Sequence, residues 1–232
     1  MCTRYLLLRP AAKLGAALGI PDFPSSSPRY NAAPRQALPV VRRETGSRRR
    51  EAALLRWGLV PAWAPTPATA APLINARAES AAGKPAFRDA FRHRRCAMPA
   101  DGFYEWQRTA AGPMPWLFEH ASGDLLLLAG LWEPHVDPAA DPAGSFAVLT
   151  TAPNALVAPV HDRMPALLPV AALDEWLDAA TPPARLAQLL APCPADRLRA
   201  RPVHPRLNHV ANDDASCLEP PPPARQLDLG IG

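Results

Sequence analysis

The sequence predicts a single mixed domain, built from many short strands and a few helices. Its 232 residues suffice for one large domain with a buried core, and 48 % of them are hydrophobic, which excludes a disordered chain. The 31 prolines, many of them in apolar surroundings, favour short strands and rigid loops over long helices. No internal repeat and no break in composition divides the chain.

Apolar runs of strand length place most of the elements. Strands are expected within 2–8, 38–41, 52–64, 96–108, 115–120, 124–134 and 145–153. Helices are expected at 10–18, 85–95, 172–180 and 183–191, and the apolar spacing at 86, 87, 90 and 91 turns the arginines of the second helix outward. Residues 43–50 read as a basic hairpin tip, 64–72 as a low-complexity loop and 201–213 as the segment that closes the fold.

The charge balance is mildly basic. The formal net charge is +4, and nearly all the basic residues are arginines, because only Lys13 and Lys84 are lysines. A guanidinium group can bind phosphate through two hydrogen bonds, so such a surface suits a phosphate-bearing partner. Charge alone is more simply explained by a solvated basic face.

The start of the chain shows no signal-peptide pattern, and no stretch approaches the roughly 18 apolar residues of a membrane span. A cytoplasmic protein with reduced thiols and no membrane contact is therefore expected. The four cysteines have no metal-binding spacing, and no histidine spacing suggests a metal site, so neither a metal nor another cofactor is expected.

Cys2 is the first candidate for chemistry. Initiator methionine is normally trimmed before a small residue, and trimming would leave a free amine and a free thiol on Cys2. The amine, with a pKa of about 7.7–8.0, condenses with an aldehyde to an imine, and the thiol then closes a thiazolidine ring. Taken alone, Cys2 is more simply an ordinary small residue at a mobile terminus.

Glu105 and His161 are candidates for proton transfer. Glu105 lies between Tyr104 and Trp106, where desolvation would raise its pKa, although a strand could also turn it to water. His161, beside Asp162, suits a proton shuttle or a buried structural histidine.

Positioning residues are suggested by the INARAES segment and the tryptophans. Asn75 offers a donor and an acceptor, and Arg77 is either a phosphate contact or the ion-pair partner of Glu79 or another carboxylate. Trp57 is assigned to the core, whereas Trp63 and Trp106, next to turns, are candidates for stacking on bases.

Ordered blocks over most of residues 1–210 resemble one family. They are MCTRY, YNAAP, RWGLVPAWA, INARAES, KPAFRDAFRHRRCAMPADGFYEW, AGLWEP, TTAPNALVAPVHDRMPALL and PVHPRLN. In this combination the chain resembles the SOS-response-associated peptidase family, whose members crosslink to abasic sites. The resemblance implies an α+β fold over 1–219, with a bent, barrel-like, mostly antiparallel sheet and a few peripheral helices, followed by a flexible proline-rich tail at 220–232.

The resemblance also implies roles for individual residues. Cys2 would form the thiazolidine, Asn75 would hold its amine, and Glu105 and His161 would move protons at the sugar. Contacts to DNA are implied for Arg4, Arg77, Arg163 and Trp106, with Trp63 as a further stacking candidate. The expected partner is single-stranded DNA containing abasic sites, bound by a monomer that joins the nucleoid through that DNA.

Two departures from the family pattern accompany the resemblance. Thr3 stands where glycine is usual, and its β-branched side chain stiffens the backbone beside Cys2. Arg35 stands where threonine is common and adds either a phosphate contact or a surface charge.

Other functions stay open at this point. One is an amidohydrolase or peptidase with Cys2 as N-terminal nucleophile, the family name being tied to removal of the first residue. Others are a non-covalent single-stranded DNA binder and a purely structural domain. Weak lyase activity would follow if the imine underwent β-elimination before ring closure.

Overall fold

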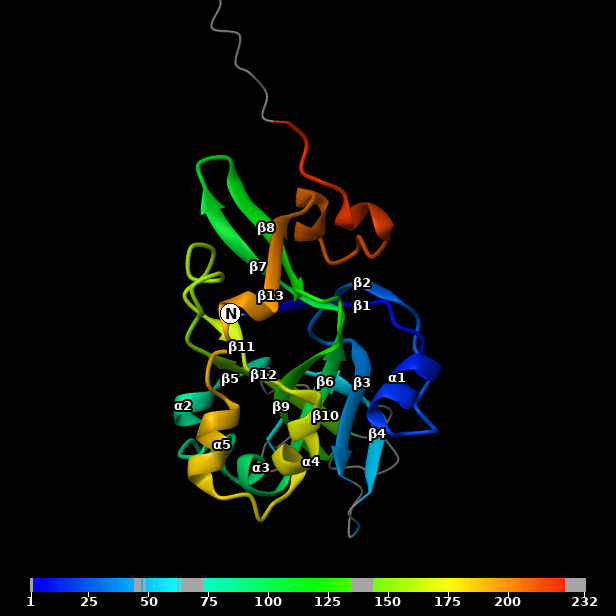
Figure 1. The fold of residues 1–232 in the computed structure, drawn as a ribbon, viewed down its shortest axis with the longest axis vertical. Coiled ribbons are helices and arrows are strands. Elements are labelled where there is room, and N and C mark those ends of the chain that lie inside the picture. The colour runs from blue at the N-terminus through cyan, green and yellow to red at the C-terminus, as the bar shows by residue number, and fades with distance from the viewer. Residues whose placement is uncertain are drawn as a thin grey trace, which may run out of the picture.

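The computed structural model describes residues 2–43, 47, 49–61, 63, 73–134 and 144–223. Two sheets form the body of the protein, and short helices lie around it (Figure 1). Residues 44–46 and 48 of the predicted hairpin tip lie outside the described residues, as do the whole of the loop 64–72 and residues 224–232 of the predicted tail. The boundary between residues 219 and 220 therefore stays a prediction.

The first sheet has five strands, ordered β13-β8-β7-β1-β2, and every pair in it is antiparallel. It brings early and late parts of the chain together, because β1 and β2 lie in the same sheet as β13. The strands are β1 (Arg4–Leu7), β2 (Arg29–Ala32), β7 (Gly102–Thr109), β8 (Gly112–His120) and β13 (Leu198–Pro202).

The second sheet closes on itself. Its strands pair in the ring β10-β4-β3-β6-β9, and β9 pairs back onto β10. In this ring only the β10–β4 pair is parallel. The ring strands are β3 (Ala37–Arg43), β4 (Arg50–Trp57), β6 (Arg95–Ala100), β9 (Leu126–Pro134) and β10 (Gly144–Thr151), to which β5 (Asn75–Arg77), β11 (Met164–Pro165) and β12 (Leu167–Leu168) attach. The predicted bent, barrel-like, mostly antiparallel sheet is confirmed.

A glycine allows the barrel to close tightly. A Cβ atom on Gly130 of β9 would lie 2.7 Å from Cε of Met98 and 2.8 Å from the carbonyl oxygen of Ala147 on β10. No side chain fits at those distances. Only glycine therefore allows β9 to approach both β6 and β10 at this point.

The core fills the barrel and the junction of the two sheets. All eight residues of β10 are buried, which is typical of a strand covered on both faces. Trp57 is fully buried, with its ring centroid 5.5 Å from that of Tyr5 in β1 and 6.0 Å from that of Phe146 in β10. The predicted core role of Trp57 is confirmed, since its ring joins the first sheet to the barrel.

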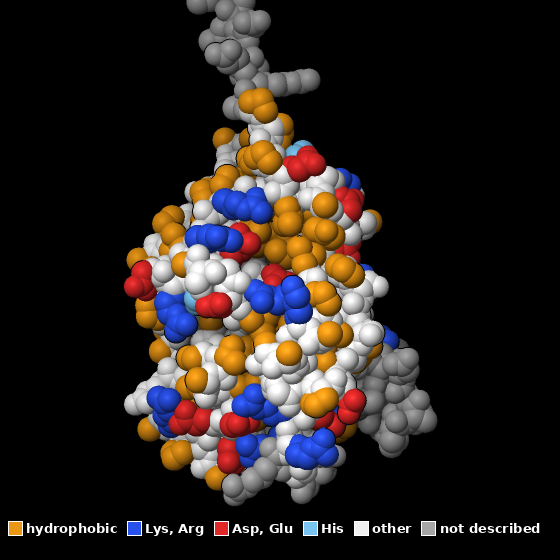
Figure 2. Space-filling view, turned by 45° about the vertical axis from the view of Figure 1, so that its right-hand side comes forward, with side chains coloured by type: hydrophobic (Ala, Val, Ile, Leu, Met, Phe, Trp, Pro, Cys, Tyr) orange, Lys and Arg blue, Asp and Glu red, His pale blue; other side chains and the backbone are white. Residues whose placement is uncertain are grey.

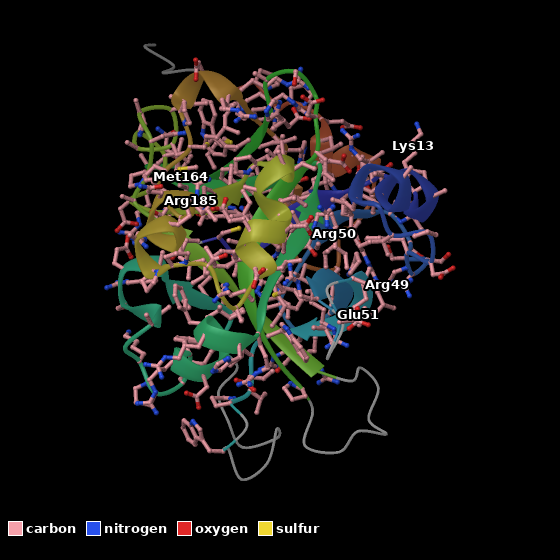
Figure 3. All side chains as sticks on the ribbon, turned by 60° about the horizontal axis from the view of Figure 1, so that its bottom comes forward. Lys13, Arg49, Arg50, Glu51, Met164 and Arg185 are labelled. Atoms are coloured by element: carbon pink, nitrogen blue, oxygen red, sulfur yellow. The ribbon has the colours of Figure 1, made fainter. Side chains whose placement is uncertain are left out.

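The helices are short and peripheral. The helix α1 (Ala11–Leu18) buries Leu14 and Leu18, presents Lys13 outward (Figure 3), and ends at Gly19, whose φ of 68° suits a helix C-terminus. The others are α2 (Ala78–Ala81), α3 (Arg88–His93), α4 (Leu173–Leu177) and α5 (Pro183–Leu189), with 3₁₀ turns at Val170–Ala172, Ala195–Arg197, Pro205–Asn208 and Ala215–Leu218. No helix of the described part of the chain is both long enough and apolar enough to cross a bilayer.

The prediction that arginines around 85–95 face outward is wrong at Arg95. The helix α3 ends at His93, and Arg95 begins β6 with only 4 % of its surface exposed. Its guanidinium donates hydrogen bonds to the carbonyls of Phe91, Arg92, Trp176 and Asp178. Burial lowers the pKa of Arg95 to about 10, so the group stays charged while it joins α3 to α4.

We expect Arg95→Met to destabilise the protein by about 3 kcal/mol, because several buried carbonyls would lose their donor. Urea unfolding measures the change, and Arg92→Met, at an exposed position on α3, is the matched control with an expected effect within about 0.5 kcal/mol. Equal free energies of unfolding for the two variants would contradict this role.

Candidate functional site

Cys2 is held between the two sheets. It precedes β1 of the first sheet and is fully buried. The Nδ2 group of Asn75, on the strand β5 attached to the barrel, donates a 2.8 Å hydrogen bond to its carbonyl oxygen. The barrel thus fixes the start of the chain at a defined position.

Asn75 contacts a different backbone group of Cys2 than the family resemblance implied. The expected contact was with the amine, and the observed contact is with the carbonyl. The Oδ1 atom of Asn75 is buried and has no hydrogen-bond partner among the described residues. The amine contact stays a prediction, because Met1 lies outside the described residues.

Glu105 lies beside the same segment. The strands β1 and β7 are antiparallel with Arg4 opposite Tyr104, so the residues after Tyr104 run alongside those before Arg4. Glu105 is only 1 % exposed, and burial raises its pKa to about 8. The expectation that desolvation would raise this pKa is confirmed, and the alternative that Glu105 faces water is excluded.

The thiol of Cys2 is also affected by this environment. Burial raises its pKa well above the ordinary value, and the negative charge of Glu105 raises it further. The Sγ atom makes one weak contact, 3.7 Å from the carbonyl oxygen of Arg4. At neutral pH Cys2 therefore carries a protonated thiol, which needs a base before it can act as a nucleophile.

His161 faces Glu105 from the loop that follows β10. Its Nε2 atom lies 3.8 Å from Oε2 of Glu105, so the two candidates for proton transfer lie together. Burial is the main reason that the pKa of His161 lies below its ordinary value. The imidazole is therefore neutral at pH 7.

Two groups meet the other ring nitrogen of His161. The backbone N–H of Arg163 donates to Nδ1 at 3.0 Å, and a carboxylate oxygen of Asp162 lies 2.9 Å away. The N–H can only donate and so requires a bare Nδ1, whereas Asp162 is 88 % exposed and its charge is screened by water. We therefore assign the proton of the neutral ring to Nε2, on the side of Glu105.

The three predicted phosphate-binding arginines differ in their surroundings. Arg163 forms a two-pronged ion pair with Glu79, at 2.8 and 2.9 Å, so its guanidinium is already engaged. Arg77 is exposed. Glu79, which was one expected ion-pair partner of Arg77, is paired with Arg163 instead. Arg4 lies half-buried over the ring of Trp106, 6.0 Å from its centroid.

The two candidate stacking tryptophans also differ. Trp63 is 69 % exposed, as a base-stacking residue requires. Trp106 is half-buried, and its Nε1–H donates a 2.7 Å hydrogen bond to Oδ1 of Asn208. Because that bond holds its ring in one orientation, Trp106 is fixed in place, whereas Trp63 is largely open to solvent.

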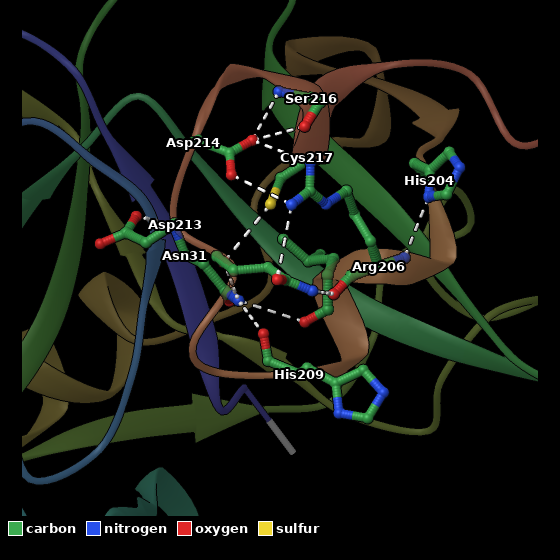
Figure 4. A network of polar contacts seen from close by, with 10 residues as sticks. Asn31, His204, Arg206, His209, Asp213, Asp214, Ser216 and Cys217 are labelled. Atoms are coloured by element: carbon green, nitrogen blue, oxygen red, sulfur yellow. Dashed lines mark hydrogen bonds and ion pairs between the residues drawn. The ribbon is translucent and has the colours of Figure 1, made fainter.

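The end of the described chain is tied to β2 by one buried side chain (Figure 4). Asn31 Nδ2 donates to the carbonyls of Leu207, His209 and Asn212, at 3.2, 3.1 and 2.9 Å. This network fixes the segment that carries Asn208, and through it Trp106. Sequence reasoning missed Asn31 and Asn208, and the only signals for them were the YNAAP and PVHPRLN blocks that contain them.

The described residues contain no group of three or more His, Cys, Asp or Glu side chains placed to hold a metal ion. The chemistry visible in the site is that of a buried thiol, a carboxyl group with a raised pKa and a neutral imidazole. Together they can transfer protons to and from a carbonyl oxygen or an imine nitrogen brought beside Cys2.

Comparisons with known proteins identify a matching family. The profile of the family described as SOS response associated peptidase (SRAP) matches residues 1–210. The chain is 36 % identical to the abasic site processing protein YoqW of Bacillus subtilis over 224 residues, covering 94 % of this chain and 99 % of that one. It is 31 % identical to the abasic site processing protein HMCES of Gallus gallus, covering 88 % of this chain and 68 % of that one.

Solved structures share the fold. A protein from Bordetella bronchiseptica superposes with a TM-score of 0.72 at 29 % identity, covering 87 % of this chain and 99 % of that one. A protein from Bacteroides thetaiotaomicron superposes with a TM-score of 0.80 at 23 % identity, covering 94 % and 99 %.

The raised pKa of Glu105 predicts a pH-dependent stability. Between its ordinary pKa of 4.5 and the folded value of about 8, the unfolded chain releases a proton that the folded chain keeps, so stability falls as pH rises. Glu105→Gln removes this titration. As pH rises across this range, we expect the free energy of unfolding of the variant to increase relative to that of the wild type by up to about 1.4 kcal/mol per pH unit. Urea unfolding at a series of pH values measures this difference. Parallel stability curves would contradict the raised pKa.

Proposed function

Because the chain belongs to the SOS response associated peptidase (SRAP) family, we propose that it processes abasic sites in single-stranded DNA by covalent capture. Cys2, freed by removal of Met1, forms a thiazolidine with the aldehyde of the lesion and shields it as a DNA–protein crosslink. The observation that carries this proposal is the burial of Cys2 beside Glu105, with its carbonyl held by Asn75.

Ring opening comes first. An abasic deoxyribose is mostly a closed hemiacetal, and only the open form presents the C1′ aldehyde. Opening requires a proton at the ring oxygen and loss of one from the C1′ hydroxyl. The carboxyl group of Glu105 is protonated at neutral pH because of its raised pKa. Its O–H donates a proton to the ring oxygen while its carbonyl oxygen accepts the proton of the C1′ hydroxyl, and the Nε2–H of His161 donates a hydrogen bond beside it.

The amine of Cys2 then attacks C1′. Loss of one water gives the imine, and a protonated Glu105 assists departure of the hydroxyl group. The buried Oδ1 of Asn75, which has no partner among the described residues, is suited to accept an N–H of this amine and so direct its lone pair toward C1′. The Nδ2–carbonyl bond keeps Cys2 in place once Met1 is gone.

Ring closure forms the S–C1′ bond. The thiol proton passes to the imine nitrogen, and the ionised form of Glu105 is the base that carries it. No further water is lost, so aldehyde and aminothiol give thiazolidine plus one water. Thr3 does not oppose this geometry, because Arg35 is the only non-glycine residue in the described ranges with a positive φ.

A second candidate is an N-terminal-nucleophile peptidase acting through the same Cys2. That reaction begins with thiolate attack on a carbonyl, and a buried thiol with a raised pKa disfavours it. Capture of an aldehyde begins instead with attack by the amine of Cys2. Burial of the thiol is therefore compatible with this reaction. The family description nevertheless keeps a peptidase step at Met1 within the proposal.

The proposal predicts a heat-stable band on a denaturing gel after incubation with single-stranded DNA that contains one abasic site. We expect Cys2→Ala to abolish the band and Glu105→Gln to slow its formation about 100-fold, since a positioned acid–base group contributes about 10²–10⁴-fold. Intact DNA of the same sequence is the substrate control.

Three outcomes separate the rival functions. A wild-type protein that starts at Cys2 yet gives no shifted band would refute the proposal. Peptide cleavage without DNA, lost in Cys2→Ala, would favour the peptidase. A cleaved DNA strand without crosslink would show a lyase that releases its imine before ring closure.

A further inference from the structure

Arg35 has an unusual backbone conformation. Its φ is 74°, and it is the only non-glycine residue with a positive φ among the described residues. A side chain in this left-handed region is disfavoured, because Cβ crowds the following carbonyl oxygen. Such a conformation persists only where surrounding bonds enforce it, and it is concentrated at binding sites.

Hydrogen bonds enforce the conformation here. The backbone N–H of Arg35 donates to the carbonyl of Trp57 at 2.7 Å, and the N–H of Trp57 donates to the carbonyl of Gln36 at 3.0 Å. The Gln36 side chain closes the turn by accepting from the N–H of Ala33 at 3.0 Å. Arg35 is therefore presented from a rigid turn rather than from a loose loop.

The sheet register places this turn at the Cys2 end of β1. Tyr5 pairs with Ala32 and Leu7 with Arg29 in antiparallel register, so the residues that follow Ala32 run toward Cys2. A second connection agrees, because the Nε1–H of Trp57 bonds to the carbonyl of Ile74, the neighbour of Asn75. Arg35 thus lies at the edge of the site on the β2 side, with Arg77 following Asn75 on β5.

The guanidinium of Arg35 is exposed and has no hydrogen bond or ion pair with any residue that the structure describes. In contrast, Arg163 is bound to Glu79 and Arg50 to Asp174. On the face shown in Figure 2, basic and acidic side chains are interspersed rather than separated into one broad basic patch.

We propose that Arg35 binds a backbone phosphate of the single-stranded DNA next to the captured lesion. The inference rests on the proposed function, which supplies the DNA. A rigid, strained turn that directs an unpartnered guanidinium to the edge of the Cys2 site fits a phosphate that must lie at a fixed distance from C1′. Arg35 and Arg77 would then hold the strand from two sides.

The test measures non-covalent binding of a short, intact, labelled oligonucleotide by fluorescence anisotropy over a series of salt concentrations. One lost phosphate contact lowers the slope of log affinity against log salt by about 0.7, which is about 5-fold in affinity at 0.1 M salt. We expect this loss for Arg35→Gln, and affinity within about 2-fold of wild type for Arg35→Lys. Arg92→Gln removes the same charge from exposed α3 and is the control with an unchanged slope.

Arg35→Gly separates binding from folding. Glycine relieves the left-handed strain, so the midpoint of thermal unfolding should rise by about 2–4 °C while DNA affinity falls as in Arg35→Gln. A weaker affinity together with a higher midpoint cannot come from a damaged fold and would support the proposal.

If Arg35→Gln matches Arg92→Gln in affinity and slope, the Arg35 contact is refuted. The proposed function is tested separately, by whether the wild type forms a crosslink with DNA that contains an abasic site. If the wild type binds DNA through Arg35 but forms no crosslink, the contact is supported and covalent capture fails. If the wild type binds no single-stranded DNA, both proposals are overturned.

Discussion

The 2.8 Å hydrogen bond from Asn75 to the carbonyl of Cys2 is the contact on which the site depends. The second residue of a chain normally has many conformations, and here it is fully buried at the junction of two sheets. Asn75 can make this bond from a fixed position because β5 is anchored by its parallel pairing with the buried strand β10. Fixing Cys2 in this way places its thiol close enough to Glu105 for the two groups to interact electrostatically. The two residues lie far apart in the sequence, so no local sequence feature would predict this interaction.

Burial then determines the protonation states of the groups around Cys2. Withdrawal from water raises the pKa of the thiol and of the Glu105 carboxyl, and lowers that of the His161 imidazole. All three groups are therefore uncharged near pH 7. Uncharged acid–base groups suit a reaction in which protons move at each step and in which the first nucleophile is a neutral amine rather than a thiolate.

Much of the fold followed from the sequence, because short apolar runs such as 124–134, bounded by turn residues, are typical of buried strands. The closed ring did not follow, since it depends on Gly130 allowing contacts between strands distant in sequence. Arg95 was misjudged because local helical spacing cannot show the carbonyls of Trp176 and Asp178 that bind it. Cys2, Asn75, Glu105 and His161 were candidates from their local sequence and received specific roles from the family resemblance. The engagement of Arg163 by Glu79 and the strained turn at Arg35 required coordinates.

The attachment point on the protein is the most direct test of the central claim. Tandem mass spectrometry of the nuclease- and protease-digested adduct locates the modified residue and its mass. We predict that the deoxyribose remnant lies on an N-terminal Cys2 lacking Met1, with one water lost, and that borohydride added after the reaction leaves its mass unchanged, because a thiazolidine contains no C=N bond. An adduct on another residue, or one that gains two hydrogens on reduction as an imine does, would contradict the account.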